Sequence, residues 1–187
     1  MRIIYTCFLV LFFGFSSSLS AQDIFIKITG ANGVIAGESQ NDAYRDHLDG
    51  FSFAQASTAA CTSSAGGSKE GCMANTGNFY VVVRLDKSLN LLRKHMYLGT
   101  PLDKVEIFFT KNQNIGKNQA YYSIRLDAAN LVSINDAISS GSDINTVQLE
   151  FDAKKIGWTQ FPTGPDGRSL PPVKFGWDRS RNVEWTF

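Results

Sequence analysis

The chain has 187 residues, enough for one domain with its own hydrophobic core after removal of a targeting segment. Its 18 basic and 17 acidic side chains nearly cancel, which excludes a general attraction to nucleic acid or anionic lipid. With 14 Phe and 16 Gly, the composition favours strands joined by turns.

The first 21 residues have the layout of a secretory signal peptide. Arg2 supplies a positive charge, residues 3–15 are almost all apolar, and a stretch of small residues ends at Ala21. This apolar run is shorter than the roughly 20 residues of a transmembrane helix; an uncleaved membrane anchor is the alternative. We expect cleavage after Ser20 or Ala21. The prediction is a signal peptide at 1–21 and a single domain at 22–187, exported to the periplasm or secreted, without stable membrane insertion.

Alternating apolar and polar residues predict most of the remaining elements. On one predicted strand, Leu48, Phe51 and Phe53 are core candidates, and on another the cleanest alternation places Val147, Leu149 and Phe151 on one face. Strands are expected over residues 23–28, 47–54, 79–85, 105–110, 121–126 with an extension at 130–134, 146–151 prolonged to 161, and 173–178. Residues 55–78 are small and polar, and they predict a long loop.

One helix is expected between the third and fourth strands. Ser88 is a plausible N-cap, with Asp86 as the alternative, and Gly99 ends the helix. Leu89, Leu92 and Met96 then fall on its buried face. Many short strands with one flanking helix indicate a mainly β protein, a small antiparallel barrel or sandwich.

Two cysteines remain after removal of the signal peptide, Cys61 and Cys72. Close together in a polar segment of an exported protein, they predict one disulfide. A free thiol pair or a redox-active pair is the alternative, although the spacing is not CxxC. A zinc site would need two more ligands, and no histidine lies nearby in the sequence.

Catalytic motifs are missing from the sequence, so we expect a non-enzymatic protein with no catalytic, cofactor-binding or metal-binding residues. Residues 37–41 (GESQN) resemble a nucleophile elbow but have Asn41 where that motif needs Gly. A Ser–His–Asp arrangement could be drawn from His47 or His95, although structural positions are the better interpretation of both.

The tryptophans and the charges near the last strand have structural explanations. Trp158, Trp177 and Trp185 could stack sugars or bases, but packing in the core or between subunits is the simpler assignment. Asp178, Arg179 and Arg181 are interpreted as a solvated edge.

Several of these segments resemble, in order, the Hcp proteins that build the inner tube of bacterial type VI secretion systems. They are residues 23–28 (DIFIKI), 37–42 (GESQND), 48–53 (LDGFSF), 86–92 (DKSLNLL) with Gly99, 122–126 (YSIRL), 147–151 (VQLEF) and 173–178 (VKFGWD). Leu89 stands where proline is common in the family. The resemblance covers nearly all of residues 22–187.

This resemblance implies a β-barrel with one flanking helix, similar to phage tail-tube proteins, that forms homo-hexameric rings able to stack into a hollow tube. The implied partners are further copies of the chain, type VI secretion components and small effector proteins, with no cofactor. Residues 55–78 fall where the family has an extended loop that contacts the neighbouring ring.

The signal peptide departs from the family pattern, because typical Hcp proteins lack one and assemble in the cytoplasm. Two hypotheses follow. The chain is an exported relative that forms rings, or it is an exported monomeric binding or effector-type module that uses the Cys61–Cys72 loop to recognise a partner.

Overall fold

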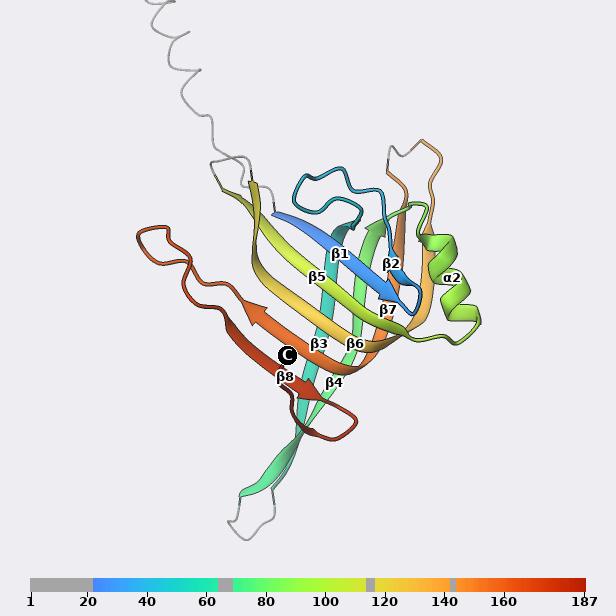
Figure 1. The fold of residues 1–187 in the computed structure, drawn as a ribbon. Coiled ribbons are helices and arrows are strands. Elements are labelled where there is room, and N and C mark those ends of the chain that lie inside the picture. The colour runs from blue at the N-terminus through green and yellow to red at the C-terminus, as the bar shows by residue number, and fades with distance from the viewer. Residues whose placement is uncertain (1–21, 64–68, 114–116, 142–143) are drawn as a thin grey trace, which may run out of the picture.

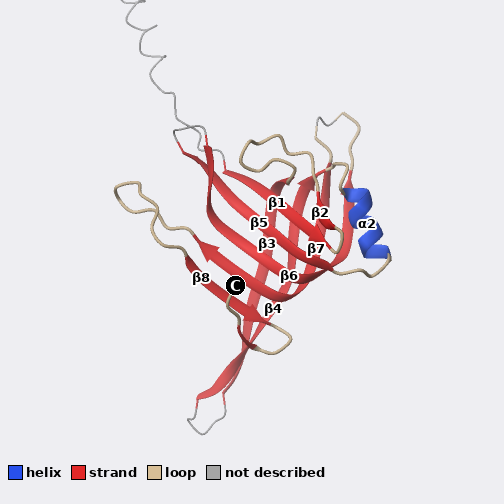
Figure 2. Cartoon of the chain, in the orientation of Figure 1, coloured by secondary structure: helices blue, strands red, loops and turns tan. Residues whose placement is uncertain are grey.

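The computed structural model describes residues 22–63, 69–113, 117–141 and 144–187, and the predicted signal peptide at 1–21 lies outside these ranges. The described residues form antiparallel strands and one helix, which confirms the predicted fold class (Figures 1 and 2). No helix among them has the length and apolar character that a membrane crossing requires. The elements are β1 (Gln22–Gly30), β2 (Gly33–Ile35), β3 (Leu48–Ser63), β4 (Lys69–Arg84), α2 (Leu89–Tyr97), β5 (Leu102–Gln113), β6 (Lys117–Ala137), β7 (Thr146–Gln160), β8 (Val173–Asp178) and β9 (Val183–Glu184).

Six strands close into a barrel in the order β4-β3-β1-β5-β6-β7, because β7 pairs back onto β4. Alternate residues of a strand point to opposite faces, so every second side chain at this closure points inward. Burial of each such side chain contributes about 1.5–3 kcal/mol. The directly opposed pairs at the closure are Phe79 with Phe151, Val81 with Leu149 and Val83 with Val147, and all six side chains are fully buried.

β7 is the branch point of the sheet. Its first half, Thr146–Phe151, pairs with β4, and its second half, Lys155–Gln160, pairs with β8. β8 therefore extends the sheet beyond the closed barrel, and β9 adds a short final pairing to it (Figure 1). The predicted strands that correspond to β7 and β8 are confirmed.

The predicted helix is confirmed as α2. Ser88 stands at the N-cap position, but its side chain makes no capping hydrogen bond; instead its backbone N–H and hydroxyl both donate to Asp86 Oδ1. Leu89 and Leu92 are buried, and Gly99 adopts a left-handed conformation with φ of 61° just after the helix. Both residues named for the start of the helix thus contribute to it.

The predicted long loop at 55–78 is wrong. In its described part, residues 55–63 continue β3 and residues 69–78 belong to β4, and the two strands form a ribbon that projects away from the barrel (Figure 1). Small polar residues gave no alternating pattern, yet main-chain hydrogen bonds between the strands do not require one. We call this projecting part, residues 55–63 with 69–78, the ribbon.

The prediction that the Phe51 side chain lies in the core is also wrong. A register shift between Gly50 and Ser52 interrupts the pairing of β3 with β4, and the Phe51 side chain is exposed. Leu48 is fully buried and Phe53 packs partly buried against the core, as expected.

Candidate functional site

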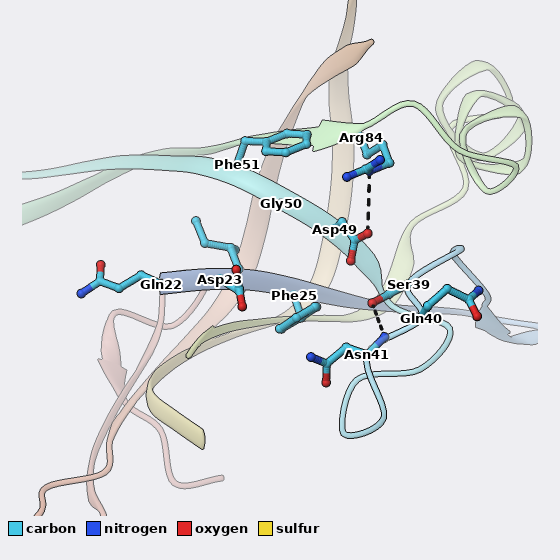
Figure 3. A pocket seen from close by; sticks show the side chains of 11 residues that line it. Gln22, Asp23, Phe25, Ser39, Gln40, Asn41, Asp49, Gly50, Phe51 and Arg84 are labelled. Atoms are coloured by element: carbon cyan, nitrogen blue, oxygen red, sulfur yellow. Dashed lines mark hydrogen bonds and ion pairs between the residues drawn. The ribbon is translucent and has the colours of Figure 1, made fainter. Parts of the chain in front are cut away.

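A pocket of about 450 Å³ lies where β1 and β3 diverge, and Figure 3 shows its lining. Asp49 forms an ion pair with Arg84 at 3.8 Å, and the Ser39 hydroxyl accepts a hydrogen bond from the backbone N–H of Asn41 at 3.4 Å. Of the described residues that line it, none is a histidine or a cysteine. Ser39 therefore has no histidine beside it in this pocket, although the carboxylates of Asp23 and Asp49 also line it.

The two histidines occupy separate structural positions. His47 lies against Tyr44 and Phe108, and its Nδ1 is 2.9 Å from the Arg45 carbonyl oxygen. His95 is on α2, with its ring beside Gly30 and its Nδ1 3.4 Å from the Thr100 carbonyl oxygen. Within the described ranges, no group of three or more His, Cys, Asp or Glu side chains could hold a metal ion.

An aromatic strip lies on β8 and its neighbour β7, in which Trp158 and Trp177 are half-buried and Trp158 also packs against the core. Trp158 is paired with Phe175 and stacks on it with ring centroids 5.6 Å apart, and Phe175 is 6.4 Å from Trp177. Phe175 is 50% exposed and Val173, two residues before it, is 63% exposed. We call Trp158, Val173, Phe175 and Trp177 the β8 patch. The exposed Val173 and Phe175, with the half-buried Trp158 and Trp177 beside them, form a surface suited to contact between subunits.

A second exposed apolar surface lies on α2. Leu91 and Leu98, the C-cap residue, are seven residues apart, or about two helical turns. They therefore lie on the same face of α2, opposite the buried Leu89 and Leu92. Tyr97 is 82% exposed and Leu98 is 67% exposed. We call Leu91, Tyr97 and Leu98 the α2 patch. The helix and β8 lie on opposite sides of the molecule (Figure 1).

The C-terminal segment packs across the outside of β7 and β8. A Cβ atom at Gly157 would collide with the Phe187 ring, and one at Gly176 would collide with the Trp185 carbonyl oxygen. Arg125 lies over both rings, at 5.5 Å from the Trp185 centroid and 5.8 Å from that of Phe187. We call residues 185–187 the strap. No local sequence pattern predicts the strap, although glycine inside a strand often marks a close approach of this kind.

The prediction of a solvated edge at 178–181 is wrong for Asp178. This side chain is buried, and its Oδ1 accepts hydrogen bonds from the Ser180 hydroxyl at 2.6 Å and the Arg181 N–H at 3.1 Å. These bonds, led by the one from the Ser180 hydroxyl, lower the pKa of Asp178. The carboxylate closes the turn between β8 and β9, and Lys155 lies 3.8 Å from it.

The ribbon carries a disulfide between Cys61 and Cys72. The two residues are directly opposed across β3 and β4, with their Cα atoms 4.1 Å apart. Their side chains are exposed. The predicted pairing is therefore present, but it links two paired strands rather than the ends of an irregular loop.

The closed antiparallel barrel with one flanking helix resembles solved structures of Hcp proteins. The fold matches a structure described as a type six secretion system protein with a TM-score of 0.76 and 19% identity, covering 88% of this chain and 100% of that one. It matches Hcp1 from Salmonella typhimurium with a TM-score of 0.69 and 19% identity, covering 88% and 99% of the two chains. For the secreted protein Hcp3 from Pseudomonas aeruginosa the TM-score is 0.60 at 21% identity, over 83% and 98%.

Residues 25–160 match the family described as type VI secretion system effector, Hcp, and the chain belongs to this family. The suspected family is thereby confirmed. A search of curated proteins finds no match.

Proposed function

We propose that the protein is an exported Hcp-type structural protein whose copies assemble head to tail into hexameric rings that stack, without catalysing a reaction. The observation that carries this proposal is the pair of apolar surfaces, the β8 patch and the α2 patch, on opposite sides of a barrel of this family. When two different surfaces of neighbouring copies meet, a row of copies has one unpaired surface at each end. These two surfaces are both paired only when the row closes into a ring. The stacked rings would then be a tube.

The proposal includes the boundaries predicted from sequence. Residues 1–21 act as a signal peptide, and residues 22–187 function as one domain outside the cytoplasm. The disulfide supports export, because disulfides persist in oxidising compartments. One structural relative is itself described as secreted. Its partners are copies of the same chain, type VI secretion components and small effector proteins.

To test this proposal, the full chain is expressed and the processed protein is purified. Light scattering after size exclusion should give six chains per particle, and micrographs should show rings. Phe175→Asp in the β8 patch and Leu98→Asp in the α2 patch should each give monomers. Phe51→Asp is the matched control, because Phe51 is 43% exposed and belongs to neither patch. A wild-type protein that stays monomeric at high concentration would contradict the proposal and favour the binding module.

Mixing the two variants tests the head-to-tail geometry. Phe175→Asp chains keep an intact α2 patch, and Leu98→Asp chains keep an intact β8 patch. One contact can then form between the two variants, so the mixture should contain dimers and no rings. An interface that joins like patches would instead give homodimers of each variant separately.

A further inference from the structure

The ribbon makes few contacts outside itself. β3 pairs with β1 only at Leu48, Asp49 and Gly50, and β4 pairs with β7 only from Phe79 onward. Beyond these points the two strands pair only with each other, from Ser57 opposite Thr76 to Cys61 opposite Cys72. Figure 1 shows them extending away from the other strands. An isolated two-stranded ribbon is only marginally stable in water.

The side chains of the ribbon add little stability of their own. Its described side chains at 58–61, 72, 74 and 75 are exposed, and most residues of this part are Ala, Ser, Thr or Asn. Burial and contact with the barrel are confined to its base, where Thr76 is buried and the Asn78 side chain donates a hydrogen bond to Glu150. Aromatic cross-strand pairs, which stabilise hairpins, do not occur in the described register from Ser57 to Cys61. Register shifts at both ends, between Gln55 and Ser57 and between Cys61 and Ser63, weaken the pairing further. The Cys61–Cys72 bond is therefore the strongest link that holds this segment together.

The free edges of the ribbon are open to another chain. Residues 55–63 and 71–78 contain no charged side chain and no proline, and the two charged residues of the ribbon, Lys69 and Glu70, stand at the start of β4. Proteins commonly use such residues to prevent an exposed strand edge from pairing with another molecule. An extended ribbon with unprotected edges can bind a partner by strand addition through main-chain hydrogen bonds. In the proposed tube, that partner is a second copy of the chain in the next ring.

We infer that the Cys61–Cys72 disulfide is a redox switch that makes the ribbon competent to dock on a second copy. This inference rests on the proposed function and concerns stacking, not ring closure, because the α2 and β8 patches lie outside the ribbon. In the oxidised protein the ribbon is held in register, and its edges are ordered before docking. In the reduced protein the ribbon must lose conformational freedom upon docking, which weakens the contact.

The switching step needs a dithiol as reductant. A thiolate of the dithiol attacks one Sγ, breaks the bond between Cys61 and Cys72 and forms a mixed disulfide. The second thiol of the dithiol then attacks that disulfide, closes a cyclic disulfide and releases the remaining cysteine sulfur. The protein gains two electrons and two protons as two thiols, and the dithiol loses the same number.

The experiment compares the processed protein with and without dithiothreitol. The Cys61→Ser/Cys72→Ser double variant is measured under the same two conditions. Micrographs count single rings and stacks, and hydrogen exchange follows the amides of Ser57, Thr58 and Ala59. We expect the oxidised rings to stack. After reduction, or in the double variant, the rings should remain but the stacks should be lost, and amide exchange in the ribbon should be at least about tenfold faster than in the oxidised protein. Dithiothreitol should not change the double variant.

The outcomes separate the two proposals. Equal stacking of oxidised and reduced rings, or oxidised rings that never stack, would overturn the redox inference and leave ring formation in place. If neither form makes rings, the proposed function fails, and the docking inference fails with it.

Discussion

Gly157 of β7 and Gly176 of β8 lie directly opposite each other, and the strap crosses the outer face of the sheet over this pair. Two adjacent residues without side chains leave a shallow depression that accepts the Phe187 ring and the main chain at Trp185. Lys155 lies 5.4 Å from the Trp185 ring centroid, and Lys174 lies 5.2 Å from that of Phe187. The two glycines thus leave room for the strap in a position where Lys155 lies beside the Trp185 ring and Lys174 beside the Phe187 ring.

Alanine at either glycine should displace the strap, but by different amounts. We expect Gly157→Ala to cost about 1–2 kcal/mol and Gly176→Ala about 2–3 kcal/mol in the free energy of unfolding, because the first meets a movable ring and the second meets backbone. Chemical denaturation measures both costs. In a Phe187→Ala background, Gly157→Ala should become nearly neutral and Gly176→Ala should remain costly. An equal cost of Gly157→Ala in both backgrounds would show that the Phe187 ring is not what Gly157 accommodates.

Barrel closure should depend on the inward face of β7. Leu149 is fully buried opposite Val81, so Leu149→Ala should lower the free energy of unfolding by about 2–5 kcal/mol through lost burial and a cavity. Gln148 points to the other face, and Gln148→Ala is the matched control, with an expected effect within about 0.5 kcal/mol. Urea denaturation followed by circular dichroism compares the two. A similar cost for both variants would contradict the closure between β4 and β7.

The parts of the fold that sequence predicted are those with a local pattern. Val147, Leu149 and Phe151 alternate with polar residues, and this alternation is itself the physical cause of their burial. The ribbon was missed because main-chain pairing and the covalent bond at Cys61 hold it, and neither produces a periodic pattern. Phe51 was misplaced because a one-residue irregularity in the strand reverses which side chains face inward.

The candidate assembly surfaces were predicted less well, for a related reason. Trp158 and Trp177 were correctly placed on strands, but whether a side chain on a strand is covered depends on which strands pack over it. β4 leaves β7 after the Phe79–Phe151 pair, and only the three-dimensional structure reveals that Val173 and Phe175 of the β8 patch are exposed and that Trp158 and Trp177 are only half-buried. The strap depends on contacts between Phe187 and Gly157, thirty positions apart, and it has no local signal.

Asp178 should make stability depend on pH. Its pKa in the folded protein is lowered, first by the hydrogen bond from the Ser180 hydroxyl, below the ordinary value of about 3.9. The ionised carboxylate therefore stabilises the fold above about pH 4, and this contribution is lost as the pH falls through the lower folded pKa. Wild type should be more stable than Asp178→Asn at pH 7, and the difference should shrink below pH 4.

Thermal unfolding of both proteins from about pH 7 to 3 measures this dependence. Asp42→Asn removes one negative charge at an exposed position and controls for the change in net charge. A difference between wild type and Asp178→Asn that stays constant across this range would mean that the carboxylate charge does not contribute to the turn.

Export can be tested through the N-terminus and the disulfide together. If residues 1–21 are a signal peptide, protein recovered from the periplasm or medium should begin at Gln22, or at Ala21 if cleavage follows Ser20. A double substitution that places charges in the apolar run, Leu11→Arg with Phe12→Arg, should prevent export. The retained protein should then carry Cys61 and Cys72 as thiols, because the cytoplasm keeps cysteines reduced. Mass spectrometry with thiol labelling reads both features in one sample. A wild-type protein that keeps Met1 and remains with the membrane would identify the apolar run as an anchor instead.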